Sequence, residues 1–89
     1  MISEKTIIIN RLGLHARAAA KLVATAGRFQ ADISVHCKGK IANAKSIMAV
    51  MMLAASQNTE VELKAEGDDA LEAIAAIMAL IQDKFGEES

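Results

Sequence analysis

Residues 59 to 66 alternate between uncharged and charged side chains, and this pattern constrains the fold more than any other in the chain. The segment reads Thr-Glu-Val-Glu-Leu-Lys-Ala-Glu. Successive side chains of a β-strand point to opposite faces, so the alternation predicts a strand with one apolar face and one charged face. The charged face has to stay in water. We therefore expect an open sheet that packs helices on one side only.

Periodic segments on both sides of this strand predict six further elements. The expected strands cover residues 6–9, 32–37 and 40–43, and the expected helices cover residues 16–26, residues 47–53, and a last segment that starts after a cap at Asp68 and extends to Phe85. The order β-α-β-β-α-β-α predicts an α+β fold, an open-faced β-sandwich in which a four-stranded antiparallel sheet packs three helices on one face. With no linker among the 89 residues, residues 1–89 are expected to form a single domain.

Composition excludes several classes of protein. Cys37 is the only cysteine, so the chain cannot form an internal disulfide, and no cationic start leads into an apolar stretch as in a secretory signal. The longest uncharged run, residues 46–59, is too short to cross a bilayer, so we expect a cytoplasmic protein with no membrane insertion. Neither a nucleotide-binding glycine motif nor metal-ligand spacing is present, so no cofactor and no metal are expected.

The formal net charge of -1 hides an uneven distribution of charge along the chain. Residues 1–45 carry a balance of +6, and residues 46–89 carry a balance of -7. A basic half could bind nucleic acid or an acidic protein partner. Because the chain has no Tyr or Trp to stack on bases, we favour a protein partner and expect no nucleic acid.

Residues 13–17, Gly-Leu-His-Ala-Arg, place an imidazole and a guanidinium where the first helix is expected to begin. The N-terminal end of a helix is partly positive, so a cation in the first turn is disfavoured by about 0.3 to 1 kcal/mol unless an anion binds there. The last helix begins with acidic residues instead, as the helix dipole favours. The start of the first helix is therefore a candidate anion site.

The same helix start suits nucleophilic chemistry at His15. The positive end of a helix disfavours the charged imidazole, which leaves a neutral ring able to attack phosphorus. The phosphoryl group would then lie beside free backbone N–H groups and the Arg17 guanidinium. The simpler alternative is that His15 is a passive helix cap. Gly13 would let the chain enter the helix at an unusual angle.

Two motifs resemble those of the histidine-containing phosphocarrier (HPr) family of the bacterial phosphoenolpyruvate-dependent sugar phosphotransferase system. Residues 13–17 resemble the family's active-site motif, and residues 43–48, Asn-Ala-Lys-Ser-Ile-Met, resemble its second motif. Length and element order agree as well, so the resemblance covers nearly the whole chain. The chain departs from the family pattern at Ala18, where Pro is usual.

The resemblance implies a phosphoryl carrier rather than an enzyme. His15 would accept a phosphoryl group on Nδ1 from enzyme I and pass it to the A component of a sugar permease, with Ala16 and Arg17 holding the phosphate. We expect a monomer. The alternative is a regulatory paralogue, as in the nitrogen-related phosphotransferase branch, whose phosphorylation state controls partner proteins. Ala18 leaves the choice of branch open.

Ser46 and the helix behind it carry two further expectations. Ser is among the best N-caps, which explains Ser46 structurally. The resemblance implies in addition that a kinase, with a matching phosphorylase, can phosphorylate Ser46 and slow transfer at the histidine. The helix is apolar on all sides, so Ile47, Met48 and Met51 are expected to face outward as a docking surface, unless loops cover them.

Overall fold

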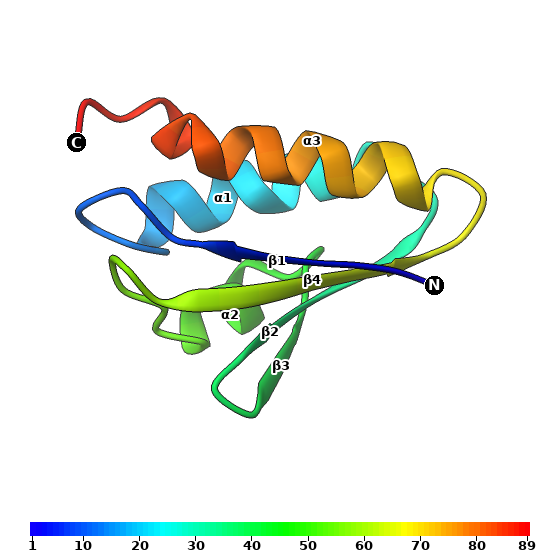
Figure 1. Cartoon of the computed structure of the whole chain (residues 1–89), viewed down its shortest axis with the longest axis horizontal. Coiled ribbons are helices and arrows are strands. Elements are labelled where there is room, and N and C mark those ends of the chain that lie inside the picture. Colours follow the sequence, from blue (N-terminus) through cyan, green and yellow to red (C-terminus); the bar gives the residue numbers. More distant parts are fainter.

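The computed structural model describes residues 1–89 as a four-stranded antiparallel sheet with helices on one face (Figure 1). The strands are β1 (Ile2–Ile7), β2 (Asp32–Cys37), β3 (Lys40–Asn43) and β4 (Glu60–Glu66), in the spatial order β1-β4-β2-β3. The helices are α1 (Ala16–Ala26), α2 (Ile47–Met52) and α3 (Ala70–Gln82), followed by the 3-10 turn η1 (Lys84–Gly86). The predicted α+β fold and its element order are confirmed.

The alternating segment forms β4, which lies between β1 and β2. Val61, Leu63 and Ala65 are buried on the helix side, whereas the charged residues between them lie on the open side. This strand pairs with β1 from Glu60 to Ala65 and with β2 from Glu62 to Glu66. The strand with the clearest pattern is therefore the one that organises the sheet.

The helices close the apolar side of the sheet. Figure 1 shows α1 and α3 running side by side, and α2 packs against both α1 and β3. In α1 the buried residues are Ala18, Ala19, Leu22 and Ala26, and three alanines among them allow a close approach to the neighbouring elements. None of the helices combines the length and the apolar character that a membrane span requires.

The first strand lies further toward the N-terminus than residues 6–9. It begins at Ile2 and ends at Ile7, in continuous register with β4 from Ile2↔Ala65 to Ile7↔Glu60. Its polar residues Ser3, Glu4 and Lys5 gave no strand signal, yet an edge strand tolerates polar side chains on both faces. Ile8 follows the strand and is fully buried.

The last helix also differs from its prediction at both ends. Its N-cap position is Asp69 rather than Asp68, and the Asp69 carboxylate does not cap the helix. The helix ends at Gln82, and Phe85 reaches the core from η1 with a left-handed backbone, at φ 55°. A turn with positive φ lets Phe85 stay buried while the chain changes direction. The spacing of apolar residues alone therefore predicted a helix that is too long at its C-terminal end.

Candidate functional site

His15 occupies the N-cap position of α1 with an extended backbone, at φ -72° and ψ 177°. Its carbonyl oxygen accepts the first helical hydrogen bond, from the Ala19 N–H at 2.8 Å. The N–H groups of Ala16, Arg17 and Ala18 therefore have no partner within the helix. The His15 side chain does not use them either, since it makes no capping hydrogen bond. These N–H groups are free to bind an anion.

Gly13 sets the direction in which the chain enters α1. Its φ is +66°, and a Cβ at this position would lie 2.4 Å from the carbonyl oxygen of Ala55. Only glycine fits such a close approach with a left-handed backbone. The Leu14 N–H donates to the same Ala55 oxygen at 2.9 Å, and the Leu14 side chain is buried. The expected role of Gly13 is confirmed, and the turn fixes the backbone just before His15.

The C-terminal residues fold back onto this helix start (Figure 1). The Glu87 carboxylate is hydrogen-bonded to Nε2 of His15, and its other oxygen accepts from the Asn10 side-chain amide at 3.0 Å. The Arg11 N–H donates to the Ser89 carbonyl oxygen at 3.0 Å. Nothing in the sequence indicated these contacts, which join residues 72 or more positions apart.

His15 and Arg17 line a shallow pocket of about 530 Å³. Its lining residues are Arg11, Leu12, His15, Ala16, Arg17, Glu87, Glu88 and Ser89. The His15 side chain is 28% exposed, and Arg17 is exposed and belongs to neither of the two ion pairs of the molecule. A guanidinium without a carboxylate partner, next to free N–H groups, is available to an incoming anion.

The Glu87 carboxylate is ionised more readily than an ordinary one. Partial burial raises its pKa, but hydrogen bonds with His15 and Asn10 and the electrostatic effects of His15 and Lys21 outweigh it and hold the pKa below its usual value. Lys21 is itself held near the C-terminal segment by a 2.6 Å hydrogen bond from Nζ to the Phe85 carbonyl oxygen. A negative charge therefore lies against the His15 ring at neutral pH.

Known proteins resemble this chain over its whole length. A family model described as the phosphotransferase-system (PTS) HPr component phosphorylation site matches residues 2–83. The phosphocarrier protein HPr of Xylella fastidiosa (strain 9a5c) is 45% identical over 89 residues and 100% of each chain, and that of Cupriavidus necator is 49% identical over 87 residues and 98% of each chain. The chain belongs to the HPr family. The crystal structure of HPr-C-His from Thermoanaerobacter tengcongensis matches with a TM-score of 0.96 and 50% identity, and covers 100% of both chains.

Membership of the HPr family decides the general function. The chain is a phosphocarrier protein of the phosphotransferase system rather than a catalytic enzyme, and its partners are proteins of that system. The relatives named above are HPr proteins and not members of the nitrogen-related branch. The prediction of an HPr phosphocarrier of the phosphotransferase system is therefore confirmed in preference to a member of the nitrogen-related branch.

Ser46 and the three outward residues of α2 lie where the sequence predicted. Ser46 is the N-cap of α2, and its Oγ accepts from the Ala49 N–H at 3.3 Å. Ile47, Met48 and Met51, called here the apolar patch, are 42%, 68% and 38% exposed. Val50, by contrast, is fully buried. The alternative that loops cover the patch is wrong.

Two exposed apolar residues beside these were not predicted. Met52 is 71% exposed at the end of α2, and Leu12 is 59% exposed at the edge of the His15 pocket. Ala54, two residues after the end of α2, is exposed as well. Its φ of 53° turns the chain out of the helix, so helical periodicity no longer applies there. The exposed apolar surface is thus wider than the apolar patch.

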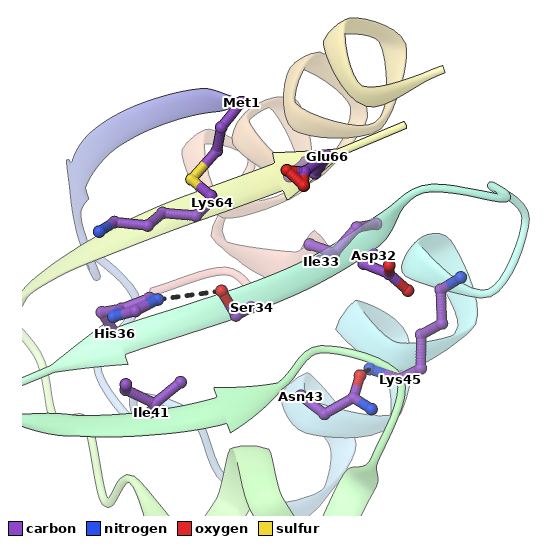
Figure 2. Close-up of a pocket in the computed structure, with 11 residues that line it drawn as sticks. Met1, Asp32, Ile33, Ser34, His36, Ile41, Asn43, Lys45, Lys64 and Glu66 are labelled. Atoms are coloured by element: carbon purple, nitrogen blue, oxygen red, sulfur yellow. Dashed lines mark hydrogen bonds between the residues drawn. The ribbon is translucent and has the colours of Figure 1, made fainter. Parts of the chain in front are cut away.

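A second pocket of about 540 Å³ lies on the open side of the sheet (Figure 2). His36 lines it, half-buried, and its Nε2 is hydrogen-bonded to the Ser34 hydroxyl at 2.9 Å. Asp32 and Glu66 lie on the same face, as Figure 2 shows. Lys45 and Lys64 line the pocket as well, so the charges offset one another, and no helix begins at this histidine to offer free N–H groups to a phosphate. The pocket lacks what the start of α1 provides, so His15 and not His36 is the candidate nucleophile.

Proposed function

We propose that His15 accepts a phosphoryl group on Nδ1 from phosphorylated enzyme I and passes it to the A component of a sugar permease. One arrangement carries this proposal: an imidazole at a helix start, beside three free N–H groups and an unpaired guanidinium. The only hydrogen bond of the ring uses Nε2, which leaves Nδ1 free to react.

The chemistry follows from this geometry. The Nδ1 lone pair forms a bond to phosphorus while the bond between phosphorus and the donor breaks, and the donor keeps that electron pair. The N–H groups of Ala16 and Arg17 and the Arg17 guanidinium then stabilise the negative oxygens. Transfer to the next protein reverses these events. The carrier is restored after each cycle and turns over no substrate by itself.

The direct test is to incubate the protein with phosphoenolpyruvate and enzyme I. One phosphate should be added per chain, labile in acid and stable in base. His15→Ala should abolish the adduct, and His36→Ala, the matched control, should keep it. A phosphate that persists on the His15→Ala variant would overturn the assignment.

Arg17→Ala tests the proposed anion contact. Transfer should slow by about tenfold or more, because a charge-assisted hydrogen bond to the phosphate is lost. Stability should not fall, since the native cation opposes the helix dipole, and a gain of about 0.3 to 1 kcal/mol in the free energy of unfolding is expected. Urea unfolding measures it, and marked destabilisation would show that Arg17 is structural instead.

We further propose that the apolar patch of α2 docks enzyme I and the A components. Flexible Met side chains suit a surface that has to fit more than one partner. Met48→Lys should weaken transfer by raising the KM for the carrier while the unfolding free energy stays within about 0.5 kcal/mol. Leu71→Lys is the matched control, because Leu71 is 64% exposed on α3 whereas Met48 is 68% exposed on α2. Equal KM values for the two variants would contradict the proposal.

Ser46 is proposed as a regulatory phosphorylation site, modified by a kinase and restored by a phosphorylase. Its side chain is half-buried at the start of α2, directly before the apolar patch. A phosphate there would add about two negative charges on the side that an acidic partner approaches. Ser46→Asp should therefore slow transfer from enzyme I. Ser46→Ala should transfer normally while losing about 0.5 to 2 kcal/mol of stability with the cap.

We also infer that residues 1–89 act as a single-domain monomer in the cytoplasm. Support comes from the one core cluster of 24 buried residues and from the free, buried Cys37, which suits a reducing compartment. Light scattering on the purified protein should give the mass of one chain, 9.4 kDa. A stable dimer would refute the oligomeric part of this inference.

A further inference from the structure

Glu87 connects the His15 ring to a buried amide. One oxygen of its carboxylate binds Nε2 of His15, and the other accepts from the Asn10 side chain at 3.0 Å. The Glu87 side chain is only 16% exposed, and Asn10 is fully buried. A carboxylate held at both oxygens has a defined orientation, unlike a surface carboxylate in water.

The groups around Glu87 are fixed in turn by the backbone. The Asn10 side-chain amide also donates to the Gly13 carbonyl oxygen at 2.8 Å, in the turn that leads to His15. Downstream of Glu87, the Ser89 carbonyl oxygen is bonded to the Arg11 N–H at 3.0 Å, and upstream Lys21 binds the Phe85 carbonyl oxygen at 2.6 Å. The C-terminal segment is thus tied on both sides of Glu87.

We propose that Glu87 is a positioning residue for phosphoryl transfer at His15, an inference that rests on the proposed function of that histidine. A carboxylate can only accept a hydrogen bond, so the contact requires a proton on Nε2. In the neutral ring this leaves the lone pair on Nδ1, the nitrogen proposed to attack phosphorus. Glu87 therefore holds the ring in its reactive tautomer and orientation.

The same contact acts on the charge that the ring acquires. When the Nδ1 lone pair bonds to phosphorus and the donor leaves with its own electron pair, no proton is released and the ring becomes a cation. The Glu87 carboxylate stabilises this cation from the Nε2 side. Arg17 and the free N–H groups stabilise the phosphoryl oxygens from the Nδ1 side. Each developing charge thus has a partner of opposite sign.

The test compares Glu87→Gln with Glu60→Gln. Glu60 is exposed on β4 at the open side of the sheet and lies outside the His15 pocket, so Glu60→Gln is the matched control for the loss of one negative charge. Gln has the size of Glu and keeps the fold, but it removes the charge and can also donate to Nε2. Amide NMR spectra of both variants verify that the fold is retained.

Two measurements decide the matter. In ¹⁵N NMR spectra, ring nitrogens of the neutral wild-type His15 should report the Nε2–H tautomer alone, and Glu87→Gln should give a mixture of tautomers. The rate of phosphate acceptance from phosphorylated enzyme I should fall about tenfold in Glu87→Gln, because a charge-assisted hydrogen bond becomes a neutral one, and should stay unchanged in Glu60→Gln.

The opposite outcomes overturn the proposal. Wild-type tautomer populations and rates in Glu87→Gln would show that the contact is incidental. A faster rate in Glu87→Gln would show that the carboxylate blocks the anion site. Neither result affects the assignment of His15 itself. That assignment fails only if the wild type takes up no phosphate, or if the His15→Ala variant still takes up phosphate.

Discussion

Ala18 is the third residue of α1, and its side chain is fully buried. Its N–H lies before the first helical hydrogen bond, so replacement by proline removes no bond of the helix. Ala18→Pro should raise the free energy of unfolding by about 0.4 to 1 kcal/mol, because the unfolded chain loses freedom. Urea unfolding measures the change.

The phosphoryl-transfer rate of Ala18→Pro should match that of the wild type, because the N–H groups of Ala16 and Arg17 remain. A lower unfolding midpoint would mean that the proline ring does not fit among the neighbours of Ala18. In that event the side chains around position 18 are packed for alanine and leave no room for a proline ring.

At the residue scale, local chemistry could be predicted and distant contacts could not. His15, Arg17 and Gly13 lie within one turn of chain, so a helix start and its dipole were enough to identify them. Glu87 is 72 residues from His15, and a glutamate near a chain end resembles any solvated charge. Only the folded backbone, which brings the end of α3 beside the start of α1, places it at the site.

Asp69 shows how one side chain joins two elements. Its carboxylate accepts from the Gln30 N–H and the Ala31 N–H, both at 2.8 Å, and so ties the start of α3 to the segment before β2. The bond from the Gln30 N–H is the largest cause that holds the pKa of Asp69 below its usual value of 3.8; the bond from Ala31 lowers it further, although partial burial acts against both.

The pH dependence of Asp69→Asn tests this link. Because the native carboxyl binds a proton only at lower pH than the unfolded one, its contribution is complete above about pH 3.8 and is lost as pH falls through the native pKa. Asp69→Asn should therefore be less stable than the wild type at pH 7, and its stability should fall less steeply below pH 3.8. Urea unfolding from pH 7 to pH 2 measures both effects. If the unfolding free energy of the variant and of the wild type fell equally steeply with pH, the link would be contradicted.

Elements with a regular pattern were predicted closely, and those shaped by neighbours were not. The β2–β3 hairpin and α1 have the predicted bounds because their signals are local. These signals are the alternation along residues 32–37, the turn at Lys38-Gly39, and Gly27 directly after the helix. By contrast, β1 includes Ser3 to Lys5 because β4 offers a partner along its whole length. Similarly, α3 ends before Phe85 because core packing, not helical spacing, places that ring.

At the scale of the whole molecule, the uneven charge along the sequence gives two faces of the fold different sets of charged side chains. Arg11 and Arg17 line the His15 pocket together with Glu87 and Glu88, whereas the strands carry four acidic residues and two lysines on the open side: Asp32, Glu60, Glu62, Glu66, Lys5 and Lys64. A partner with an acidic surface would thus be repelled from the open side of the sheet and would approach the pocket side, where Arg11 and Arg17 are exposed.

The salt dependence of transfer should report this attraction. The second-order rate constant with phosphorylated enzyme I should fall by about tenfold as ionic strength rises from 0.05 to 0.5 M, because salt screens the electrostatic attraction between the two proteins. Arg11→Ser should flatten this dependence, whereas Lys64→Ser on the open face should leave it unchanged. A rate constant independent of salt would rule out electrostatic steering.

The two ends of the chain lie at opposite ends of the molecule, as Figure 1 shows. Ser89 lines the His15 pocket and is bonded to the Arg11 backbone, so a purification tag or fluorescent fusion joined after it would start inside that pocket. The same addition before Met1 would start at the beginning of the edge strand β1, at the end of the molecule opposite the His15 pocket. Reagents for binding or single-molecule studies are therefore best attached at the N-terminus.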